Sequence, residues 1–279
     1  MVVQAYETHT QRPSKHIKVY AHRGASEDVP EHTLAAYKQA IVDGADGLEC
    51  DIRLTADSQL ICVHDRRIDR TSSGRGLVST LELAELRSLD FGQWKDTWAD
   101  FEDPEEPDRD RSEVLTLETL LGLVADAGRP IELLIETKHP TRYAGLVERR
   151  LVETLHQFSY AHPRLGASSP VKIMSRSPWS LRRIRNMAPS LTTAFLMPRV
   201  PVRFRDGSLP VGVTVAGPSI EVVRAHPHYV DRVHARGHSA YVWTVNRVLD
   251  LEMCAQIGVD GIITDRPRRT LERLEHLGR

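Results

Sequence analysis

The 279-residue chain has few cysteines, few aromatic residues and no long apolar run. Its three cysteines form no C-x-x-C pair, which argues against a disulfide framework and a thiolate zinc site and fits a reducing compartment. The N-terminus lacks the apolar segment of a secretion signal, and no stretch approaches the roughly 18 apolar residues of a membrane span. We therefore expect a soluble, cytoplasmic protein without membrane insertion.

An excess of charge of one sign is also missing, because Lys plus Arg number 37 and Asp plus Glu number 38. The formal net charge of −1 lacks the basic excess typical of nucleic-acid-binding proteins, so we expect no nucleic-acid partner. A hydrophobic fraction of 41% and a charged fraction of 27% are typical of a globular protein. The length fits two domains or one α/β barrel of about 250 residues, and the oligomeric state stays open.

Apolar, β-branched segments alternate with segments of helical spacing, which predicts an α/β protein with a largely parallel sheet. Nine candidate strands compete for the eight places of a barrel. They are Ile17–Ala21, Gly47–Leu54, Leu60–His64, Ile131–Thr137, Val171–Ser175, Thr192–Met197, Val211–Ala216, Ala240–Val245 and Gly261–Thr264.

The clearest predicted helix follows the first strand, because Thr33 can cap it, apolar residues recur at helical spacing, and Gly44 can end it. The other main predicted helices are Leu146–His156, Ser180–Met187, Ile220–Ala235, Leu249–Ile257 and Arg269–Leu277.

Two segments depart from this alternation. Only Thr55–Gln59 separates two candidate strands, whereas a parallel crossover needs about a dozen residues, so a hairpin or a shortened crossover must lie there. Residues 65–113 hold a Gly-rich turn, an amphipathic helix at Leu81–Leu89 and the acidic run Asp100–Glu113. We interpret this segment as a small insertion beside the mouth of the barrel.

The strand Gly47–Leu54 has an unusual polar face. Its period of two places Glu49, Asp51 and Arg53 on one side and apolar residues on the other. Two carboxylates inside a barrel require a positively charged partner, since unpaired buried charges are costly. The alternative is a solvent-exposed edge strand in which Arg53 pairs with Asp51.

The strand Ile131–Thr137 repeats this pattern, because Glu136 and Lys138 share one face. Together with Glu49 and Asp51, Glu136 completes an all-oxygen set of carboxylates. Such a set suits one hard cation, Mg²⁺ or Ca²⁺, whereas zinc more often recruits His or Cys.

Two of the 13 histidines lie at the ends of predicted strands: His22 follows the first strand, in A-H-R-G, and His64 ends the third, in C-V-H-D. Because the C-terminal ends of barrel strands face the active-site mouth, both imidazoles are candidates for acid–base chemistry there. A single histidine is more often structural, so we assign no role to most of the others.

The motifs H-R-G-A-S-E-D-V-P-E-H-T, E-C-D-I-R-L-T, C-V-H-D, I-E-T-K, V-W-T-V-N and D-G-I-I-T-D-R-P follow one another from His22 to Pro267. In this order they resemble the glycerophosphodiester phosphodiesterase family. The resemblance implies a TIM-type (β/α)8 barrel with a small inserted subdomain after the third strand. The expected barrel spans residues 17–279, with the insertion at about residues 65–113 and an N-terminal extension at residues 1–16.

The resemblance also implies roles at the matching positions: His22 and His64 as the acid–base pair, Glu49, Asp51 and Glu136 as the metal ligands, Arg23 and Lys138 as phosphate-binding residues, and Trp243 as a wall of the glycerol pocket. One position departs from the family pattern, because His32 stands where the family usually has Asn. We expect that difference to affect only the local geometry at the start of the first helix.

The implied activity is metal-dependent hydrolysis of small glycerophosphodiesters, such as glycerophosphocholine or glycerophosphoethanolamine, to glycerol 3-phosphate and an alcohol. The resemblance implies attack by the substrate's own 2-hydroxyl, which gives a cyclic phosphate that water then opens. A lysophospholipase D activity is one alternative and needs an apolar groove, to which the insertion could contribute Leu83, Leu86, Leu89, Phe91, Trp94 and Trp98. A catalytically inactive phosphodiester-binding relative is another, although no implied catalytic or metal-ligating residue is missing.

Overall fold

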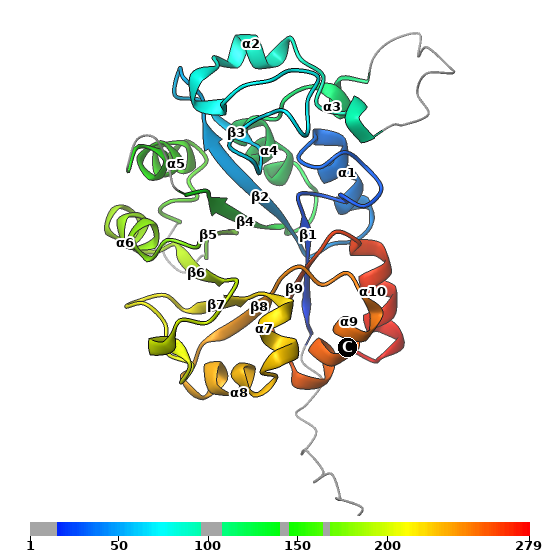
Figure 1. Cartoon of the computed structure of the whole chain (residues 1–279), viewed down its shortest axis with the longest axis vertical. Coiled ribbons are helices and arrows are strands. Elements are labelled where there is room, and N and C mark those ends of the chain that lie inside the picture. The colour runs from blue at the N-terminus through cyan, green and yellow to red at the C-terminus, as the bar shows by residue number, and fades with distance from the viewer. Residues whose placement is uncertain (1–15, 96–107, 140–144, 164–167) are drawn as a thin grey trace, which may run out of the picture.

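The computed structural model describes residues 16–95, 108–139, 145–163 and 168–279, and in these residues a closed barrel of parallel strands is surrounded by helices (Figure 1). The barrel closes because β1 pairs with both β2 and β9. This arrangement is a TIM (β/α)8 barrel and confirms the predicted fold class. Its eight strands are β1 (Lys18–His22), β2 (Gly47–Leu54), β4 (Glu132–Thr137), β5 (Val171–Ser175), β6 (Thr192–Met197), β7 (Val215–Pro218), β8 (Ser239–Val242) and β9 (Gly261–Thr264).

The ninth candidate strand lies outside the barrel. β3 (Leu60–Cys62) pairs with β2 in the antiparallel direction, so the Thr55–Gln59 connection is a hairpin turn. In that turn the Thr55 side chain accepts a hydrogen bond from the backbone N–H of Gln59. The predicted strand Leu60–His64 was two residues too long, because pairing with β2 ends at Cys62.

Most of the helices cover the outside of the barrel, whereas α2 and α3 lie in the segment after β3 (Figure 1). They are α1 (Leu34–Val42), α2 (Leu83–Arg87), α3 (Arg109–Ser112), α4 (Leu117–Ala125), α5 (Leu146–Gln157), α6 (Pro178–Met187), α7 (Ile220–Ala225), α8 (His228–Ala235), α9 (Val248–Ile257) and α10 (Pro267–His276). Short 3-10 turns occupy η1 (Val78–Thr80), η2 (Gln93–Lys95) and η4 (Val202–Phe204). As predicted, Thr33 caps α1 by accepting a hydrogen bond from the Ala36 N–H.

Two predicted elements differ in detail from the structure, and one helix was missed. The predicted helix Ile220–Ala235 is two helices, α7 and α8, and Pro227 lies between them, where it cannot donate a backbone hydrogen bond. The predicted strand Val211–Ala216 begins only at Val215, because Val211 is 90% exposed and lies in a turn. Helix α4 was not predicted, although Thr116 caps it and its buried leucines recur at helical spacing.

The two faces of the barrel strands contact different surroundings. In β2, Leu48 and Cys50 pack with α-helical residues in an outer apolar cluster, so the alternate residues face the barrel interior. Part of the interior is apolar and includes Tyr20, Leu134 and Tyr241. The carboxylates of β2 and β4 therefore occupy a polar part of an otherwise apolar lumen.

Ile61 of β3 and residues that follow β3 form a separate apolar cluster, which also contains Ile68, Val78, Leu86 and Phe91. The predicted helix Leu81–Leu89 is shorter in the structure, where α2 begins at Leu83. Residues 1–15 and 96–107, which include most of the predicted N-terminal extension, Trp98 and much of the acidic run, lie outside the described residues. Among the helices that the structure describes, none has the length and apolar character to cross a membrane.

A charged cluster centred on Glu132 joins three strands near their N-terminal ends. The carboxylate lies 2.5 Å from Lys18 Nζ, from Lys172 Nζ and from the hydroxyl of Tyr20, which donates to it. Burial alone raises the pKa of Glu132, but the hydrogen bonds from these three residues outweigh burial and lower it below the ordinary 4.5.

We expect Glu132→Gln to lower the free energy of unfolding by about 1–3 kcal/mol, because charge-assisted hydrogen bonds to a partly buried carboxylate are lost. Since the folded pKa is depressed, the contribution should be fully present above pH 4.5 and disappear as the pH falls through the folded value. Urea denaturation at several pH values measures this. Glu153→Gln, which removes a surface ion pair with Arg150, is the matched control, and an equal loss in both variants would contradict the prediction.

Candidate active site

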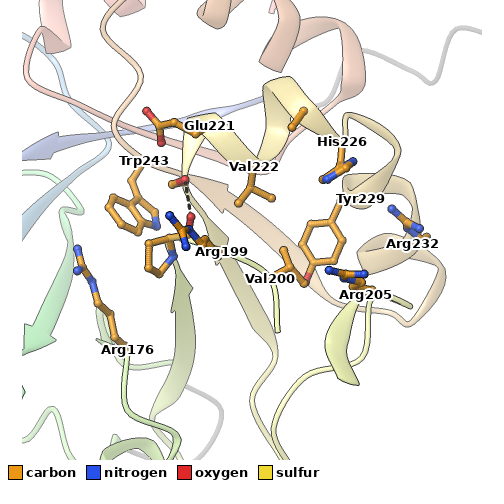
Figure 2. A pocket seen from close by; sticks show the side chains of 13 residues that line it. Arg176, Arg199, Val200, Arg205, Glu221, Val222, His226, Tyr229, Arg232 and Trp243 are labelled. Atoms are coloured by element: carbon orange, nitrogen blue, oxygen red, sulfur yellow. Dashed lines mark hydrogen bonds between the residues drawn. The ribbon is translucent and has the colours of Figure 1, made fainter. Parts of the chain in front are cut away.

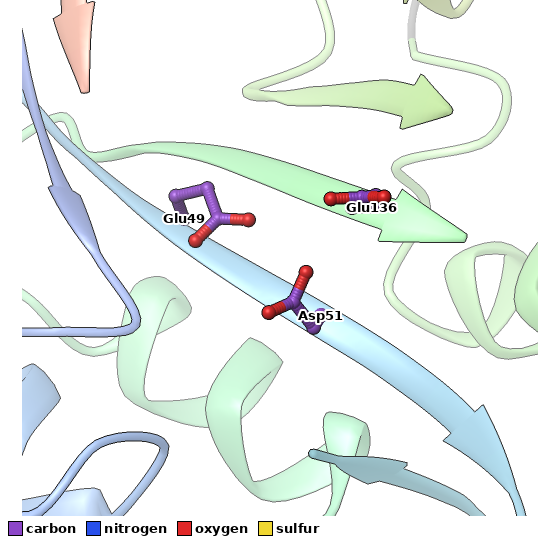
Figure 3. Close-up of side chains that lie close together, drawn as sticks. All are labelled: Glu49, Asp51 and Glu136. Atoms are coloured by element: carbon purple, nitrogen blue, oxygen red, sulfur yellow. The ribbon is translucent and has the colours of Figure 1, made fainter. Parts of the chain in front are cut away.

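The candidate site lies where β2 and β4 run side by side. Asp51 is paired with Glu136 in the register of these strands, and Glu49 lies two residues before Asp51 on the same face. Figure 3 shows the three side chains on the two neighbouring strands. One carboxylate oxygen from each lies within 4.8 Å of the other two. Strand pairing thus brings together the three residues that the sequence suggested as metal ligands.

These carboxylates are almost completely removed from solvent. Glu49 is 2%, Asp51 1% and Glu136 7% exposed. The alternative of a solvent-exposed edge strand is therefore wrong. Arg53 does not pair with Asp51 in the way that alternative required, since its guanidinium donates two hydrogen bonds to the backbone carbonyl of His64.

Two cations compensate part of this buried negative charge. Lys138 Nζ lies 2.9 Å from both Asp51 Oδ1 and Glu136 Oε2. Arg23 Nε lies 3.2 Å from Asp51 Oδ2, and its backbone N–H donates to Glu49. Both predicted phosphate-binding residues therefore contact the carboxylate cluster directly.

The three carboxyl groups differ in acidity. Burial, followed by repulsion from Asp51, raises the pKa of Glu49 well above its usual range and that of Glu136 to about 7. Burial also acts to raise the pKa of Asp51, but Lys138 and other positive neighbours outweigh it and hold that pKa well below its usual range. The raised pKa values of Glu49 and Glu136 show that Lys138 and Arg23 do not fully compensate ionisation of all three carboxyl groups, and a bound cation would favour the ionised forms.

The donor set fits a hard divalent cation. All three ligands are carboxylates, they converge within one ligand sphere, and no thiol or imidazole is among them. With Lys138 and Arg23 counted, the cluster retains a formal charge of −1 when the three carboxylates are ionised. A divalent cation therefore fits both the geometry and the charge, and Glu49, Asp51 and Glu136 are the residues that would hold it.

His64 reaches the site by a route that differs from the sequence expectation. It does not end a barrel strand, because β3 runs antiparallel to β2 and returns the chain from the hairpin to the level of Asp51, where the N–H of Val63 donates to the Asp51 carbonyl. His64 Nδ1 lies 2.7 Å from Asp65 Oδ1. Arg70 donates to the other oxygen of Asp65 at 2.6 Å. The insertion thus helps to orient this imidazole.

The electrostatic surroundings keep His64 neutral. Burial lowers the pKa of His64 to about 4, and the charges of Lys138 and Arg23 act in the same direction. Because the neighbouring carboxylate of Asp65 can only accept, the Nδ1 proton of a neutral His64 points toward it. The Nε2 lone pair is then left available to accept a proton.

His22 follows β1 and is held by a second carboxylate. Its Nδ1 lies 2.6 Å from Asp265 Oδ1, and Asn246 donates to Asp265 Oδ2 at 2.5 Å. Burial raises the pKa of Asp265, but the hydrogen bonds from His22 and Asn246 outweigh it and lower the pKa to about 2. Asp265 is therefore ionised and fixes the orientation of the His22 ring.

Three cavities open at this end of the barrel. His64, Glu136 and Lys138 line one of about 510 Å³. His22 and Arg23 line a smaller one of about 200 Å³. Trp243, which follows β8 and donates a hydrogen bond to the Gly217 carbonyl, lines a third. The predicted site residues thus gather at one end of the barrel, although the two histidines line separate cavities.

His32 reaches further into the site than its place before α1 suggested. Its Nε2 lies 3.1 Å from Asp51 Oδ2, and its Nδ1 lies 2.8 Å from the hydroxyl of Tyr37. The expectation of a purely local effect at the helix start was therefore wrong. The imidazole contacts a candidate metal ligand directly.

Several polar residues of the site were not singled out from the sequence. Asp65 directly follows His64, so a carboxylate next to a candidate histidine was a usable signal. Asp265 lies in the motif T-D-R-P, but its partner His22 is 243 residues away, and no local pattern links them. Arg176, which lines both the His64 and the Trp243 cavities, carries no local signal either.

The chain is similar to known proteins over most of its length. A model of the glycerophosphoryl diester phosphodiesterase family matches residues 22–269. The "Probable glycerophosphodiester phosphodiesterase 1" of Mycobacterium tuberculosis is 46% identical over 260 residues, which cover 93% of each chain. A glycerophosphodiester phosphodiesterase of Caldanaerobacter subterraneus is 32% identical over 258 residues, which cover 89% of this chain and 94% of that protein.

A solved structure shares the fold. The phosphodiesterase of Oleispira antarctica, determined in complex with the product sn-glycerol-3-phosphate, has a TM-score of 0.78 at 22% identity and covers 92% of this chain and 96% of its own. At that identity the similarity supports the barrel architecture.

We expect Mg²⁺ or Ca²⁺ to raise the melting temperature of the chelator-treated protein. At a hundred times the Kd, binding to the folded state alone gives about 2.7 kcal/mol, or roughly 5–10 °C for a chain of this size. Differential scanning fluorimetry of Glu49→Gln and Glu136→Gln should show little shift, whereas Glu153→Gln on the outer face of α5 should behave as the wild type. Equal shifts in all variants would exclude the carboxylate cluster as the binding site.

Proposed function

The chain belongs to the glycerophosphoryl diester phosphodiesterase family, and from this premise we propose that it hydrolyses small glycerophosphodiesters, such as glycerophosphocholine and glycerophosphoethanolamine, to glycerol 3-phosphate and an alcohol. As a member of that family it is a glycerophosphodiester phosphodiesterase. The observation that carries the proposal is the convergence of Glu49, Asp51 and Glu136 at the end of the barrel where His22 and His64 also lie. The proposed reaction depends on one divalent cation, Mg²⁺ or Ca²⁺.

Charge balance supports this substrate class. Three carboxylates and a divalent cation sum to −1, and a phosphodiester adds another −1. Arg23 and Lys138 supply two positive charges, which bring the complex to neutrality. When bound, the cation polarises a phosphoryl oxygen as a Lewis acid. Trp243 provides the flat apolar surface on which we place the glycerol unit.

We assign the two histidines opposite roles. His64 is neutral near pH 7 and holds a free Nε2, so it accepts the proton of the substrate's 2-hydroxyl as that oxygen bonds to phosphorus. The remaining role falls to His22, which gives its proton to the alcohol oxygen as the phosphorus–alcohol bond breaks. The cyclic phosphate that results is opened when water loses a proton to His22 and His64 returns its proton to the 2-oxygen.

The apolar groove of a lysophospholipase D receives little support from the insertion. Leu86 and Phe91 are buried in the cluster after β3, so they are unavailable to an acyl chain. Trp94, which is 37% exposed, is the large apolar residue of the described part of the insertion that an acyl chain could contact. We also propose the cytoplasm as the location, since Cys50, Cys62 and Cys254 are buried and free of disulfide bonds. For the domain organisation we propose the limits given above for the barrel and the insertion.

We expect His22→Ala and His64→Ala each to lower kcat for glycerophosphocholine by about 10²–10⁴. With glycerophospho-4-nitrophenol, whose leaving group needs no proton, the loss in His22→Ala should shrink to about tenfold or less, while the loss in His64→Ala should persist. The control His156→Ala, on the outer helix α5, should match the wild type. The opposite pattern would exchange the roles, and an unchanged rate in either variant would remove that histidine from the mechanism.

The cyclic route requires a free hydroxyl beside the ester carbon. An oriented internal nucleophile contributes about 7 kcal/mol or more, whereas one hydrogen bond contributes about 0.5–1.5 kcal/mol, or about 3 kcal/mol with a charged partner. We therefore expect 2-deoxyglycerophosphocholine to be cleaved many orders of magnitude more slowly, and the 1-deoxy analogue to lose only a hydrogen-bond contribution. Cleavage of the 2-deoxy analogue within about a hundredfold of the parent rate would show that the cyclic route is wrong.

A further inference from the structure

The proposed reaction leaves most of the Trp243 cavity without a role. This cavity has a volume of about 810 Å³, and Arg176 also lines the cavity of His64 and Lys138. It lies between the segment after β6, helices α7 and α8, and Trp243 after β8 (Figure 2). It is therefore positioned to hold a part of the substrate that extends past Trp243.

The walls of this cavity are strongly positive. Four arginines line it: Arg176, Arg199, Arg205 and Arg232. Glu221 is the acidic residue among the lining residues. None of the four forms an ion pair with a carboxylate in the part of the chain that the structure describes. By contrast Arg236, just beyond α8, pairs with Asp206 at 2.5 Å and does not line the cavity.

Aromatic rings hold two of these guanidinium groups in place. Arg176 lies 5.1 Å from the centre of the Trp243 ring, and Arg232 lies 6.0 Å from that of Tyr229. Figure 2 shows Arg205 and Arg232 near Tyr229 at the end of the cavity remote from Trp243. Rings orient the guanidinium groups but do not neutralise them, so the positive charge is retained.

This combination favours an anion. A concave wall that carries charges of one sign strengthens the electrostatic potential inside the cavity. One guanidinium group can also donate two parallel hydrogen bonds to two oxygens of a phosphate. Apolar side chains, among them Val200 and Val222, also line the cavity, so the ligand meets less water than on an open surface. A quaternary ammonium group such as choline would be repelled by the same arginines.

We propose that this cavity binds a second phosphate, carried on the C1 oxygen of the substrate's glycerol unit. The inference rests on the proposed function, which places glycerol against Trp243 and so directs its C1 substituent into the arginine-lined space. The 2-hydroxyl stays free in such a molecule, and the reaction above is unchanged. The substrate class is then glycerophosphodiesters that carry a further phosphate on glycerol.

Binding of two small phosphates tests the proposal without requiring turnover. In isothermal titration calorimetry with Mg²⁺ present, glycerol 1,3-bisphosphate should bind at least about tenfold more tightly than glycerol 3-phosphate, because its second phosphate gains charge-assisted hydrogen bonds. Arg176→Gln and Arg199→Gln, at the Trp243 end of the cavity, should each reduce this ratio to about threefold or less. Arg149→Gln, the same charge change on the outer face of α5, should preserve the wild-type ratio.

Equal Kd values for the two compounds in the wild type, or the same ratio in all variants, would overturn the proposal. Hydrolysis of glycerophosphocholine, measured in parallel, separates this outcome from a failure of the proposed function. A protein that prefers the bisphosphate but does not cleave glycerophosphocholine would retain the arginine site and lose the proposed reaction. A protein that cleaves glycerophosphocholine without the preference would retain the reaction and lose the arginine site.

Discussion

The burial of three carboxylates inside the barrel is the constraint on which the rest of the site depends. Unpaired charges in such a place are costly, and the structure surrounds them with Lys138, which follows β4, and with Arg23 and His32 from the loop between β1 and α1. These contacts hold the carboxylates in one place before any ligand arrives. The same contacts leave the cluster with a formal negative charge that attracts a divalent cation. The contacts that stabilise the fold are therefore compatible with the proposed chemistry.

The hairpin between β2 and β3 has a comparable importance for His64. A direct crossover from β2 would carry the chain to the outside of the barrel, whereas the hairpin returns it to the mouth. Asp65 and Arg70 then orient the imidazole from the inserted segment. His22 is held from the opposite end of the sequence by Asp265. The two histidines therefore have independent supports, as the opposite roles in the proposed mechanism require.

The net charge of −1 conceals a strongly uneven distribution. Carboxylates are concentrated in the lumen beside β2 and β4, and the cavity between β6 and α8 is lined by arginines that form no ion pair with a carboxylate among the described residues. A substrate that bridges the two regions would place one phosphate near the carboxylate cluster and its cation and another group among the arginines. The whole-chain charge, which lacks a basic excess, contained no information about these local fields.

The sequence by itself determined the features that arise from local geometry. The period of two in β2 and β4 assigned Glu49, Asp51 and Glu136 to the inner face because side chains alternate along any strand. Tertiary structure decided which neighbours meet. The five-residue connection after β2 was compatible with a hairpin or a crossover, and only the closed barrel shows that β4, and not β3, is the neighbour of β2 within the barrel. The contact of His32 with Asp51 joins residues that are separated in the chain, and so does the cavity lined by Arg176, Arg205 and Arg232. Such contacts depend on how the barrel closes, and no local pattern encodes them.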